Sequence, residues 1–166
     1  MNITKQIAGY LMSRSLVLVS VETCTAGAIG SMMADQRGTS GCLDLGYVAH
    51  SAAALAALPG VNTQTIARHG LVSEAVARET AEGALARSAG RASVALASVG
   101  WLANEDHEPG VAVTHCLAWA CSEGGRVHSA GETVRLSGRR SEIRRSIARI
   151  ALLGLPRFVD GVFARE

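Results

Sequence analysis

Two short segments combine hydroxyl, thiol and glycine residues in patterns that suit anion binding or nucleophilic attack. The first, residues 22–27, reads Glu-Thr-Cys-Thr-Ala-Gly and follows the β-branched run at 16–21. Backbone N–H groups at a strand-to-helix corner, with the positive end of the helix, form a natural site for phosphates and other anions. The same residues also suit a structural role, with Thr23 or Thr25 as the helix N-cap and Cys24 in the core.

The second segment places a hydroxyl pair between glycines, in the order Gly38-Thr39-Ser40-Gly41. A tight glycine turn can expose the Ser40 hydroxyl as a nucleophile, although serine needs a base to activate it. His50 lies near the far end of the strand predicted after Ser40, and imidazole titrates near neutral pH. A serine in such a turn commonly does no more than close it, so Ser40 also has a structural interpretation.

A third group consists of arginines near the carboxyl end of the chain. Arg140 and Arg144 lie at the head of the last predicted helix, where two guanidinium groups can hold a phosphate or a carboxylate. One alternative is a solvated helix face. A nucleic-acid contact is the weakest alternative, because aromatic residues make up only 4% of the chain and the net charge is +2.

The hydrophobic pattern predicts the elements that position these residues. Strands are expected at 16–21, 44–51, 92–99, 111–120 and 126–136. Helices are expected at 3–13, 26–33, 52–58, 63–68, from Ser73 to a stop at Gly90, and at 143–153. Strands alternating with helices predict an α/β fold, and the length suits a single domain over residues 1–166.

Composition excludes several classes of protein. Hydrophobic residues make up 48% of the chain and charged residues 18%, which excludes a disordered protein. No apolar run approaches the roughly 18 residues needed to cross a bilayer, and the first residues lack a signal-peptide core. Four cysteines without C-x-x-C or zinc-finger spacing predict free thiols and no metal site. We therefore expect a cytoplasmic protein that binds neither membrane nor nucleic acid.

Taken together and in order, four segments resemble the carboxy-terminal domain family of the competence/damage-inducible protein CinA. Glu22-Thr23-Cys24-Thr25-Ala26-Gly27 is similar to the family's Glu-Ser-Cys-Thr-Gly-Gly, and Gly38-Thr39-Ser40 is similar to its Gly-Ser-Ser. Residues 69–77 resemble His-Gly-x-Val-Ser-Glu-x-Val-Ala, and residues 138–144 resemble Gly-Asp-Arg-x-x-Val-Arg. These segments cover nearly the whole chain.

The resemblance implies a three-layer α/β/α sandwich with a mixed sheet, whose partner is a small-molecule nucleotide or another phosphorylated ligand. The implied reaction hydrolyses the carboxamide of nicotinamide mononucleotide to nicotinic acid mononucleotide and ammonia, with no cofactor or metal. It makes Ser40 the nucleophile and Arg140 a substrate ligand, in a homo-oligomeric protein. The residues expected around the substrate are Glu22, Thr23, Cys24, Thr25, Gly27, Thr39 and Arg140.

Two departures from the family pattern concern the chemistry directly. The family's Tyr-Ser-Asn-x-x-Lys reads His-Ser-Ala-Ala-Ala-Leu at 50–55, so the assisting tyrosine and lysine are replaced by His50 and Leu55. The family's loop Gly-Ile-Ala-Gly-Pro reads Gly-Trp-Leu-Ala-Asn at 100–104. One hypothesis is an altered amidohydrolase in which His50 is the general base for Ser40. The other is a homologue that binds a pyridine nucleotide or another phosphorylated small molecule without turnover, and the departures favour lost or altered activity.

Overall fold

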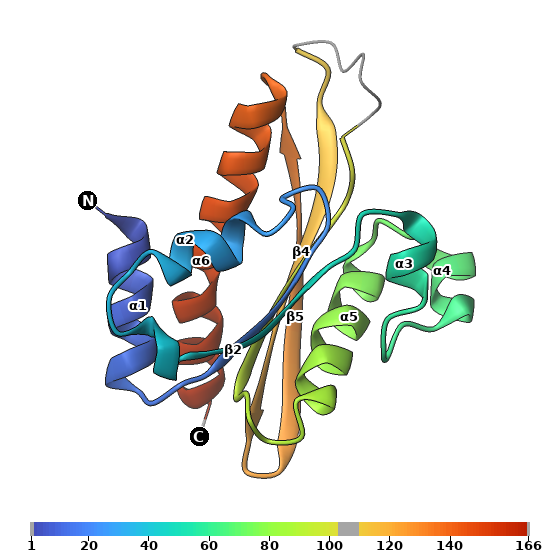
Figure 1. The fold of residues 1–166 in the computed structure, drawn as a ribbon. Coiled ribbons are helices and arrows are strands. Elements are labelled where there is room, and N and C mark those ends of the chain that lie inside the picture. Colours follow the sequence, from blue (N-terminus) through green and yellow to red (C-terminus); the bar gives the residue numbers. More distant parts are fainter. Residues whose placement is uncertain (1, 103–109, 166) are drawn as a thin grey trace.

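A single mixed sheet forms the centre of the molecule in the computed structural model, which describes residues 2–102 and 110–165. Its five strands follow the order β2-β1-β3-β4-β5 (Figure 1). Their bounds are Leu18–Glu22 for β1, Leu43–Val48 for β2, Val94–Val99 for β3, Val113–Glu123 for β4 and Arg126–Leu136 for β5. Strand β1 runs parallel to β2 and β3, whereas β4 is antiparallel to both β3 and β5.

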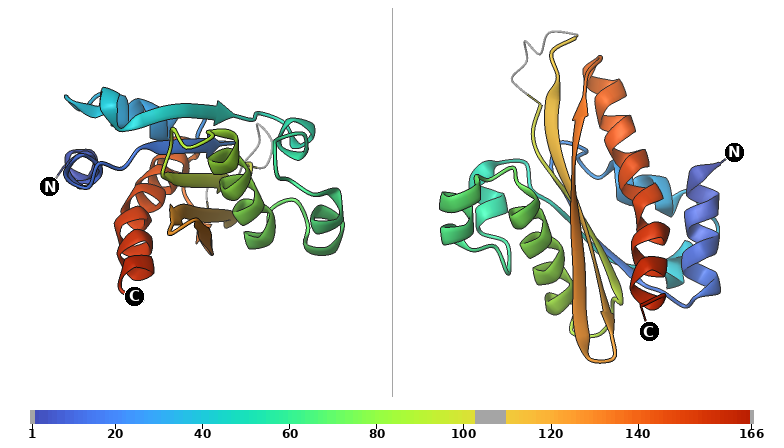
Figure 2. Two further views of the ribbon diagram at one scale, coloured as in Figure 1. Left: turned by 90° about the horizontal axis from the view of Figure 1, so that it is seen from below. Right: turned by 180° about the vertical axis from the view of Figure 1, so that it is seen from behind.

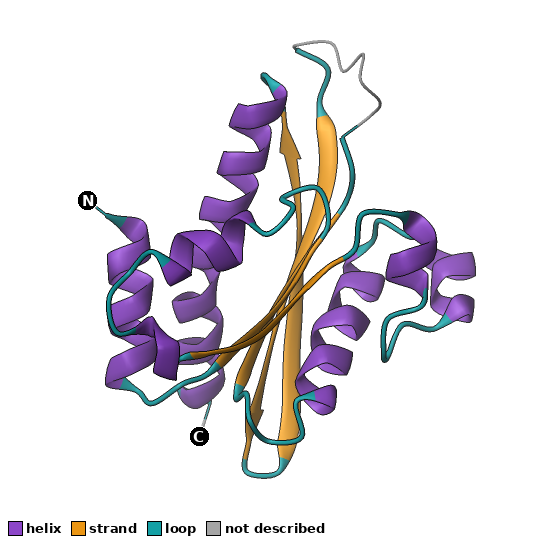
Figure 3. Cartoon of the chain, in the orientation of Figure 1, coloured by secondary structure: helices purple, strands orange, loops and turns teal. Residues whose placement is uncertain are grey.

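Helices cover both faces of this sheet (Figures 1 and 2). They are α1 (Ile3–Ser13), α2 (Ala28–Ala34), α3 (Ala52–Ala56), α4 (Thr63–His69), α5 (Glu74–Arg87) and α6 (Arg140–Phe163), with a 3-10 turn η1 at Thr39–Gly41. Helices α1, α2 and α6 lie on one face, and α5 lies on the other with α3 and α4 beside it. The predicted α/β/α sandwich with a mixed sheet is confirmed, with the strands between two helical layers (Figure 3).

The hydrophobic periodicity explains how these layers are held together. In α1 the buried positions Ile3, Ile7 and Leu11 recur every four residues and pack into the same core as α6. Strands β1 and β3 are buried along their whole length, as expected for central strands covered on both faces. The sheet therefore separates two cores, one under α1, α2 and α6 and one under α5.

Helix α6 extends ten residues beyond the predicted end at 153, and it continues through Pro156. A proline inside a helix removes one backbone hydrogen bond and normally ends or kinks the helix. Here Leu155, Val159 and Val162 keep the apolar face of the helix buried on both sides of the proline. Burial of this face outweighs the local cost, so the sequence prediction of a shorter helix was wrong.

Strand boundaries also differ from the prediction where local turns intervene. Ser15 adopts φ 54° and Leu16 N donates to Leu11 O at 2.9 Å, so β1 begins at Leu18 rather than at residue 16. Ser51 Oγ accepts a hydrogen bond from Ala54 N at 3.1 Å. Ser51 is therefore the N-cap of α3, which ends the strand earlier than predicted.

The parallel arrangement of three strands sets the position of the candidate site. The carboxyl ends of β1, β2 and β3 lie at the same edge of the sheet, because parallel strands point the same way. The corner at 23–27, His50 and the segment at 100–102 each follow one of these ends. Ligand sites of α/β proteins commonly form at such an edge. Within the described residues, no helix is long and apolar enough to cross a membrane.

Candidate functional site

A pocket of about 280 Å³ opens at the carboxyl ends of the three parallel strands. This volume is close to the lower end of the range for small-molecule sites. Its lining consists of Thr23, Cys24, Ala26, His50, Trp101, Leu102, Arg140 and Arg144. The pocket thus contains five residues that the sequence singled out as candidates, namely Thr23, Cys24, His50, Arg140 and Arg144. The strand-to-helix corner and the predicted guanidinium share one cavity.

Ser40 lies before the amino end of β2, whereas the pocket lies at the carboxyl end of that strand. It is exposed in the 3-10 turn that precedes the strand, whereas His50 follows the strand's carboxyl end. The six residues of β2 separate them by roughly 16 Å of extended chain. Thr39, which precedes Ser40, is buried and donates from Oγ1 to Gln36 O at 2.9 Å. The Thr39 hydroxyl therefore closes the turn. Within one chain the structure does not bring Ser40 together with His50, and neither Ser40 nor Thr39 lines the pocket.

Glu22 and Thr25 stabilise the corner from inside. The buried Glu22 carboxylate accepts hydrogen bonds from Thr25 Oγ1 at 2.6 Å, from Ile29 N at 3.0 Å and from Gly30 N at 3.1 Å. A carboxylate at a helix N-terminus is stabilised by the helix dipole. The backbone donors at the start of α2 therefore bind the protein's own carboxylate. Gly27, with φ 91°, is the N-cap of this helix and lies outside the pocket lining.

Thr23 ties the ends of two strands together. Its Oγ1 lies 2.7 Å from Gly100 O and 3.0 Å from Ser98 O, and it accepts a hydrogen bond from Gly100 N at 3.0 Å. Cys24 N also donates to Gly100 O, at 3.3 Å. These bonds bridge β1 and β3 at the floor of the pocket. Thr23 thus has a structural role, although part of its surface lines the cavity.

The first turns of α6 supply the positive charge of the site. Arg144 donates from Nε to Cys24 O at 2.8 Å and from Nη2 to Thr25 O at 3.2 Å. Arg140 precedes it by four residues and so projects from the same helix face. Among the residues that the structure describes, Arg140 pairs with no carboxylate. Arg144 therefore fixes the corner, and Arg140 leaves its guanidinium available to a ligand.

Behind the pocket lies a buried histidine that no motif in the sequence identified. His115, in β4, is 1% exposed. Its Nε2 lies 2.7 Å from Ser98 Oγ in β3, and its Nδ1 lies 3.9 Å from Cys24 Sγ. Burial lowers the pKa of His115 to about 4. The sequence did hold a signal, since a histidine within the apolar strand 111–120 needs buried partners.

The Cys24 thiol lies between this imidazole and the arginines. Burial raises the pKa of Cys24 to about 11, while the nearby charges of Arg144 and Arg140 oppose the increase. The same burial keeps His115 uncharged, so thiol and imidazole form a neutral pair at neutral pH. Trp101 Nε1 is also buried beside the pocket and finds no hydrogen-bond acceptor in the described part of the chain. Trp101 belongs to the segment 100–104 that departs from the family pattern.

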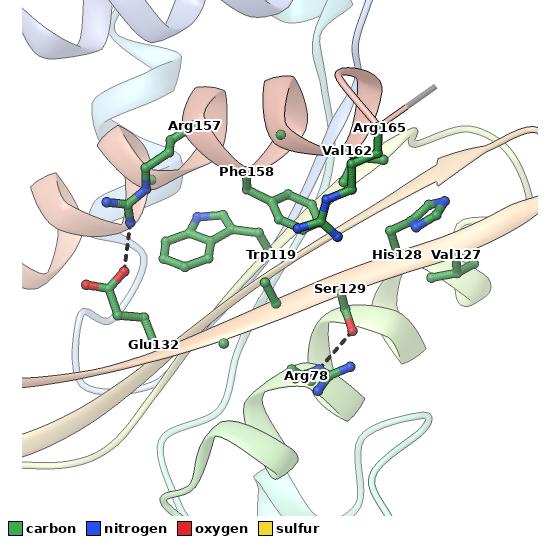
Figure 4. Close-up of a pocket in the computed structure, with 14 residues that line it drawn as sticks. Arg78, Trp119, Val127, His128, Ser129, Glu132, Arg157, Phe158, Val162 and Arg165 are labelled. Carbon is green, nitrogen blue, oxygen red and sulfur yellow. Dashed lines mark hydrogen bonds and ion pairs between the residues drawn. The ribbon is translucent and has the colours of Figure 1, made fainter.

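A larger hollow of about 560 Å³ lies along β5 and the carboxyl half of α6 (Figure 4). None of the predicted site residues lines it. Two of its three arginines have partners nearby: Arg157 forms an ion pair with Glu132 at 2.8 Å, and Arg78 Nε donates to Ser129 Oγ at 3.0 Å. The smaller pocket, which gathers a thiol, an imidazole and a free guanidinium, is the better candidate for chemistry.

Fold and site together define an α/β/α sandwich with a basic, cysteine-containing pocket at the carboxyl ends of its parallel strands. A family model described as the CinA C-terminal domain matches residues 1–159, and the chain belongs to this family. It is 36% identical over 156 residues to a CinA-like protein of Mycolicibacterium vanbaalenii, covering 94% of this chain and 36% of that relative. It spans between 22% and 38% of the length of three such relatives.

A shorter relative matches over most of its own length. The nicotinamide-nucleotide amidohydrolase PncC of Escherichia coli is 33% identical over 156 residues, covering 92% of this chain and 90% of that protein. Among solved structures, the competence damage-inducible protein A of Klebsiella pneumoniae is similar with a TM-score of 0.76 and 28% identity. That match covers 92% of this chain and 91% of the Klebsiella chain.

Proposed function

We propose that this chain binds a pyridine mononucleotide of the nicotinamide mononucleotide class in the 280 Å³ pocket. The observation that carries the proposal is the position of Arg140. Its guanidinium lines the pocket beside the strand-to-helix corner and is free of carboxylate partners among the described residues. The name of the Escherichia coli relative, which covers 92% of this chain, supports the choice of ligand class.

Arg140 suits the phosphate of such a ligand for two physical reasons. A guanidinium can donate two parallel hydrogen bonds to a phosphate, and these bonds are stronger than neutral ones. Arg140 is also the first residue of the 24-residue helix α6, whose N-terminus carries partial positive charge. Arg144 maintains the position of this helix end through its bonds to the corner.

Two other groups offer contacts to the rest of the ligand. The unpartnered Trp101 N–H can donate to a carbonyl or carboxylate oxygen, which would remove the cost of leaving a buried donor unpaired. His50 is exposed at the rim and presents a polar ring to the same cavity. Hydrolysis by Ser40 and His50 of one chain receives no support, because β2 lies between them.

Calorimetric titration tests this proposal with three ligands that differ in one group each: nicotinamide mononucleotide, nicotinic acid mononucleotide and nicotinamide riboside. The mononucleotides are expected to bind at least tenfold more tightly than the riboside, because the riboside lacks the phosphate. Arg140→Ala should remove most of that difference. Arg145→Ala is the matched control, since Arg145 is exposed and outside the pocket.

Two results would count against a phosphate site at Arg140. One is equal affinity for the riboside and the mononucleotide in the unmodified protein. The other is an equal loss of affinity in Arg140→Ala and Arg145→Ala, which would indicate a general effect of positive charge. Ser40→Ala should bind all three ligands as the unmodified protein does, because Ser40 lies outside the pocket.

A further inference from the structure

We propose that Cys24 is the nucleophile of an amide-hydrolysing site in this pocket, that His115 is its general base, and that Ser98 positions His115. This inference rests on the proposed function for its substrate, a pyridine mononucleotide carrying a carboxamide. It assigns the chemistry to Cys24 in the corner after β1, Ser98 in β3 and His115 in β4, instead of to the serine turn before β2.

The first argument is the accessibility of the thiol. All four cysteines of the chain lie in the described residues, and all are free. Cys42, Cys116 and Cys121 are buried, whereas Cys24 is partly exposed and lines the pocket. Cys24 therefore has a route to a ligand bound at Arg140, and the other three thiols are enclosed by the core.

The second argument is the arrangement of the three side chains. Cys24 Sγ lies 3.9 Å from His115 Nδ1, and the opposite ring nitrogen lies 2.7 Å from Ser98 Oγ. This is the order of nucleophile, base and orienting group that activates serine and cysteine nucleophiles in unrelated folds. With a proton on Nε2 shared with Ser98, Nδ1 carries the lone pair that faces the thiol.

The third argument is that the backbone makes room for this contact. A Cβ at Gly100 would lie 2.5 Å from His115 Nδ1, closer than atoms approach without a shift. Gly100 also has φ +151°, a conformation that side-chain-bearing residues rarely adopt. Only glycine at this position lets the imidazole edge reach Cys24. A buried histidine without this contact would leave Nδ1 without a partner, at a cost in free energy.

The reaction balances with water as the sole co-reactant. As Sγ bonds to the carboxamide carbon, the thiol proton moves to His115 Nδ1. The C–N bond then breaks and the leaving nitrogen takes this proton, which releases ammonia and leaves a thioester on Cys24. Water attacks the thioester carbon and gives a proton to Nδ1, the C–S bond breaks, and the proton returns to Sγ. The products are nicotinic acid mononucleotide and the unchanged enzyme.

Burial raises the pKa of Cys24 and lowers that of His115, which disfavours a thiolate–imidazolium pair before substrate binds. The thiol proton therefore moves to the imidazole only as Sγ bonds to the carboxamide carbon. The positive charge of Arg144 lies near the sulfur and stabilises negative charge that develops on the carboxamide oxygen, while Arg140 holds the phosphate. The pocket therefore supplies a nucleophile, a base and an electrostatic contribution from separate elements of the fold.

The experiment measures ammonia release from nicotinamide mononucleotide, and intact mass after acid quenching, in the full chain and four variants. Cys24→Ala is expected to abolish turnover and the thioester adduct while retaining mononucleotide affinity within about threefold. His115→Gln should lower kcat by about 10²-fold or more, as expected for loss of a general base. Ser98→Ala should lower kcat with little change in KM. Ser40→Ala, the matched nucleophile control, should remain fully active.

A second readout does not require turnover. Alkylation of the unmodified protein by iodoacetamide should occur at Cys24, and bound mononucleotide should protect it. His115→Gln should slow this alkylation at least tenfold, whereas His69→Gln, an exposed histidine, should not change it.

The outcomes separate the two proposals. Absence of mononucleotide binding, with His115-dependent alkylation of Cys24 intact, overturns the proposed ligand and keeps the Cys24–His115 pair. Binding without ammonia release, or turnover that survives Cys24→Ala, overturns the assignment of Cys24 as nucleophile. Turnover abolished by Ser40→Ala overturns it as well, in favour of the serine turn. Alkylation unaffected by His115→Gln overturns the role of His115.

Discussion

Arg144 in α6 donates a hydrogen bond from Nε to Cys24 O at 2.8 Å, across 120 positions of sequence. A second bond, from Nη2 to Thr25 O at 3.2 Å, gives the guanidinium two adjacent carbonyl acceptors. A planar donor fork of this kind fixes orientation as well as distance. The last helix thereby determines where the corner after β1 lies, and with it the position of the Cys24 thiol.

Replacement of Arg144 should disturb both stability and the site. Arg144→Ala removes two charge-assisted hydrogen bonds, and we expect the free energy of unfolding in urea to fall by about 1–3 kcal/mol. Arg144→Lys should recover little of this loss, because an ammonium cannot reproduce the fork. Arg145→Ala serves as the control and should change the free energy of unfolding by less than about 0.5 kcal/mol, as expected for an exposed residue. Equal effects at both positions would contradict the role of the Arg144 bonds.

Glu22 should prove essential for the fold and dispensable as a direct ligand contact. Glu22→Gln places an NH₂ group among the three donors that the carboxylate now binds, so donors are left unsatisfied. We expect a loss of about 1–3 kcal/mol in unfolding free energy. Asp35→Asn, an exposed acid at the other end of α2, should cause no comparable loss. A mononucleotide affinity that falls with no loss of stability in Glu22→Gln would instead indicate direct ligand contact.

The sequence predicted most of the fold because the decisive patterns are local. The spacing of Ile3, Ile7 and Leu11 places the first helix at its observed bounds, and the Gly124-Gly125 turn marks the hairpin before residues 126–136. The end of α6 was missed because burial along the sheet overrides the local effect of Pro156. Such burial depends on residues distant in sequence.

The site was less predictable for a similar reason. Motifs identified the corner and Arg140, both of which line the pocket. They paired Ser40 with His50 because His50 stands at the family's tyrosine position, yet β2 separates the two residues. His115 and Ser98 become neighbours only when β3 and β4 pair, so no local motif joins them to Cys24. Homo-oligomerisation and a cytoplasmic location stay predictions.

His115 should make stability depend on pH in a defined window. Its pKa is about 4 in the folded protein against an ordinary value of 6.5, because burial disfavours the charged ring. Between these values the unfolded chain binds a proton that the folded chain does not. Stability should therefore fall as the pH decreases from about 6.5 to about 4, by about 1.4 kcal/mol per unit and about 3 kcal/mol in total. Above pH 6.5 both states are neutral at this ring, and the contribution vanishes.

Urea unfolding of His115→Gln at several pH values checks this linkage. Glutamine can keep a hydrogen bond to Ser98 Oγ but does not titrate, so the difference from the unmodified protein should change by about 3 kcal/mol across the window. His69→Gln is the control, because His69 is exposed and its removal should leave the pH profile unchanged. Parallel pH profiles for the unmodified protein and His115→Gln would refute the assignment to His115.

Gly100→Ala tests whether the space beside the imidazole matters for the thiol, with Cys24 and His115 both retained. The new methyl would lie 2.5 Å from Nδ1, so the ring must move away from Cys24 Sγ. We expect alkylation of Cys24 to slow to nearly the rate of His115→Gln, and stability to fall by about 1–3 kcal/mol through overpacking. Gly70→Ala also places alanine in a backbone conformation that side-chain-bearing residues rarely adopt, φ 86° and ψ 158°, with nothing within 4 Å of its Cβ. Because backbone strain is common to both variants, a slower reaction in Gly100→Ala alone would isolate the displaced imidazole, whereas unchanged alkylation there would show that the thiol reacts independently of it.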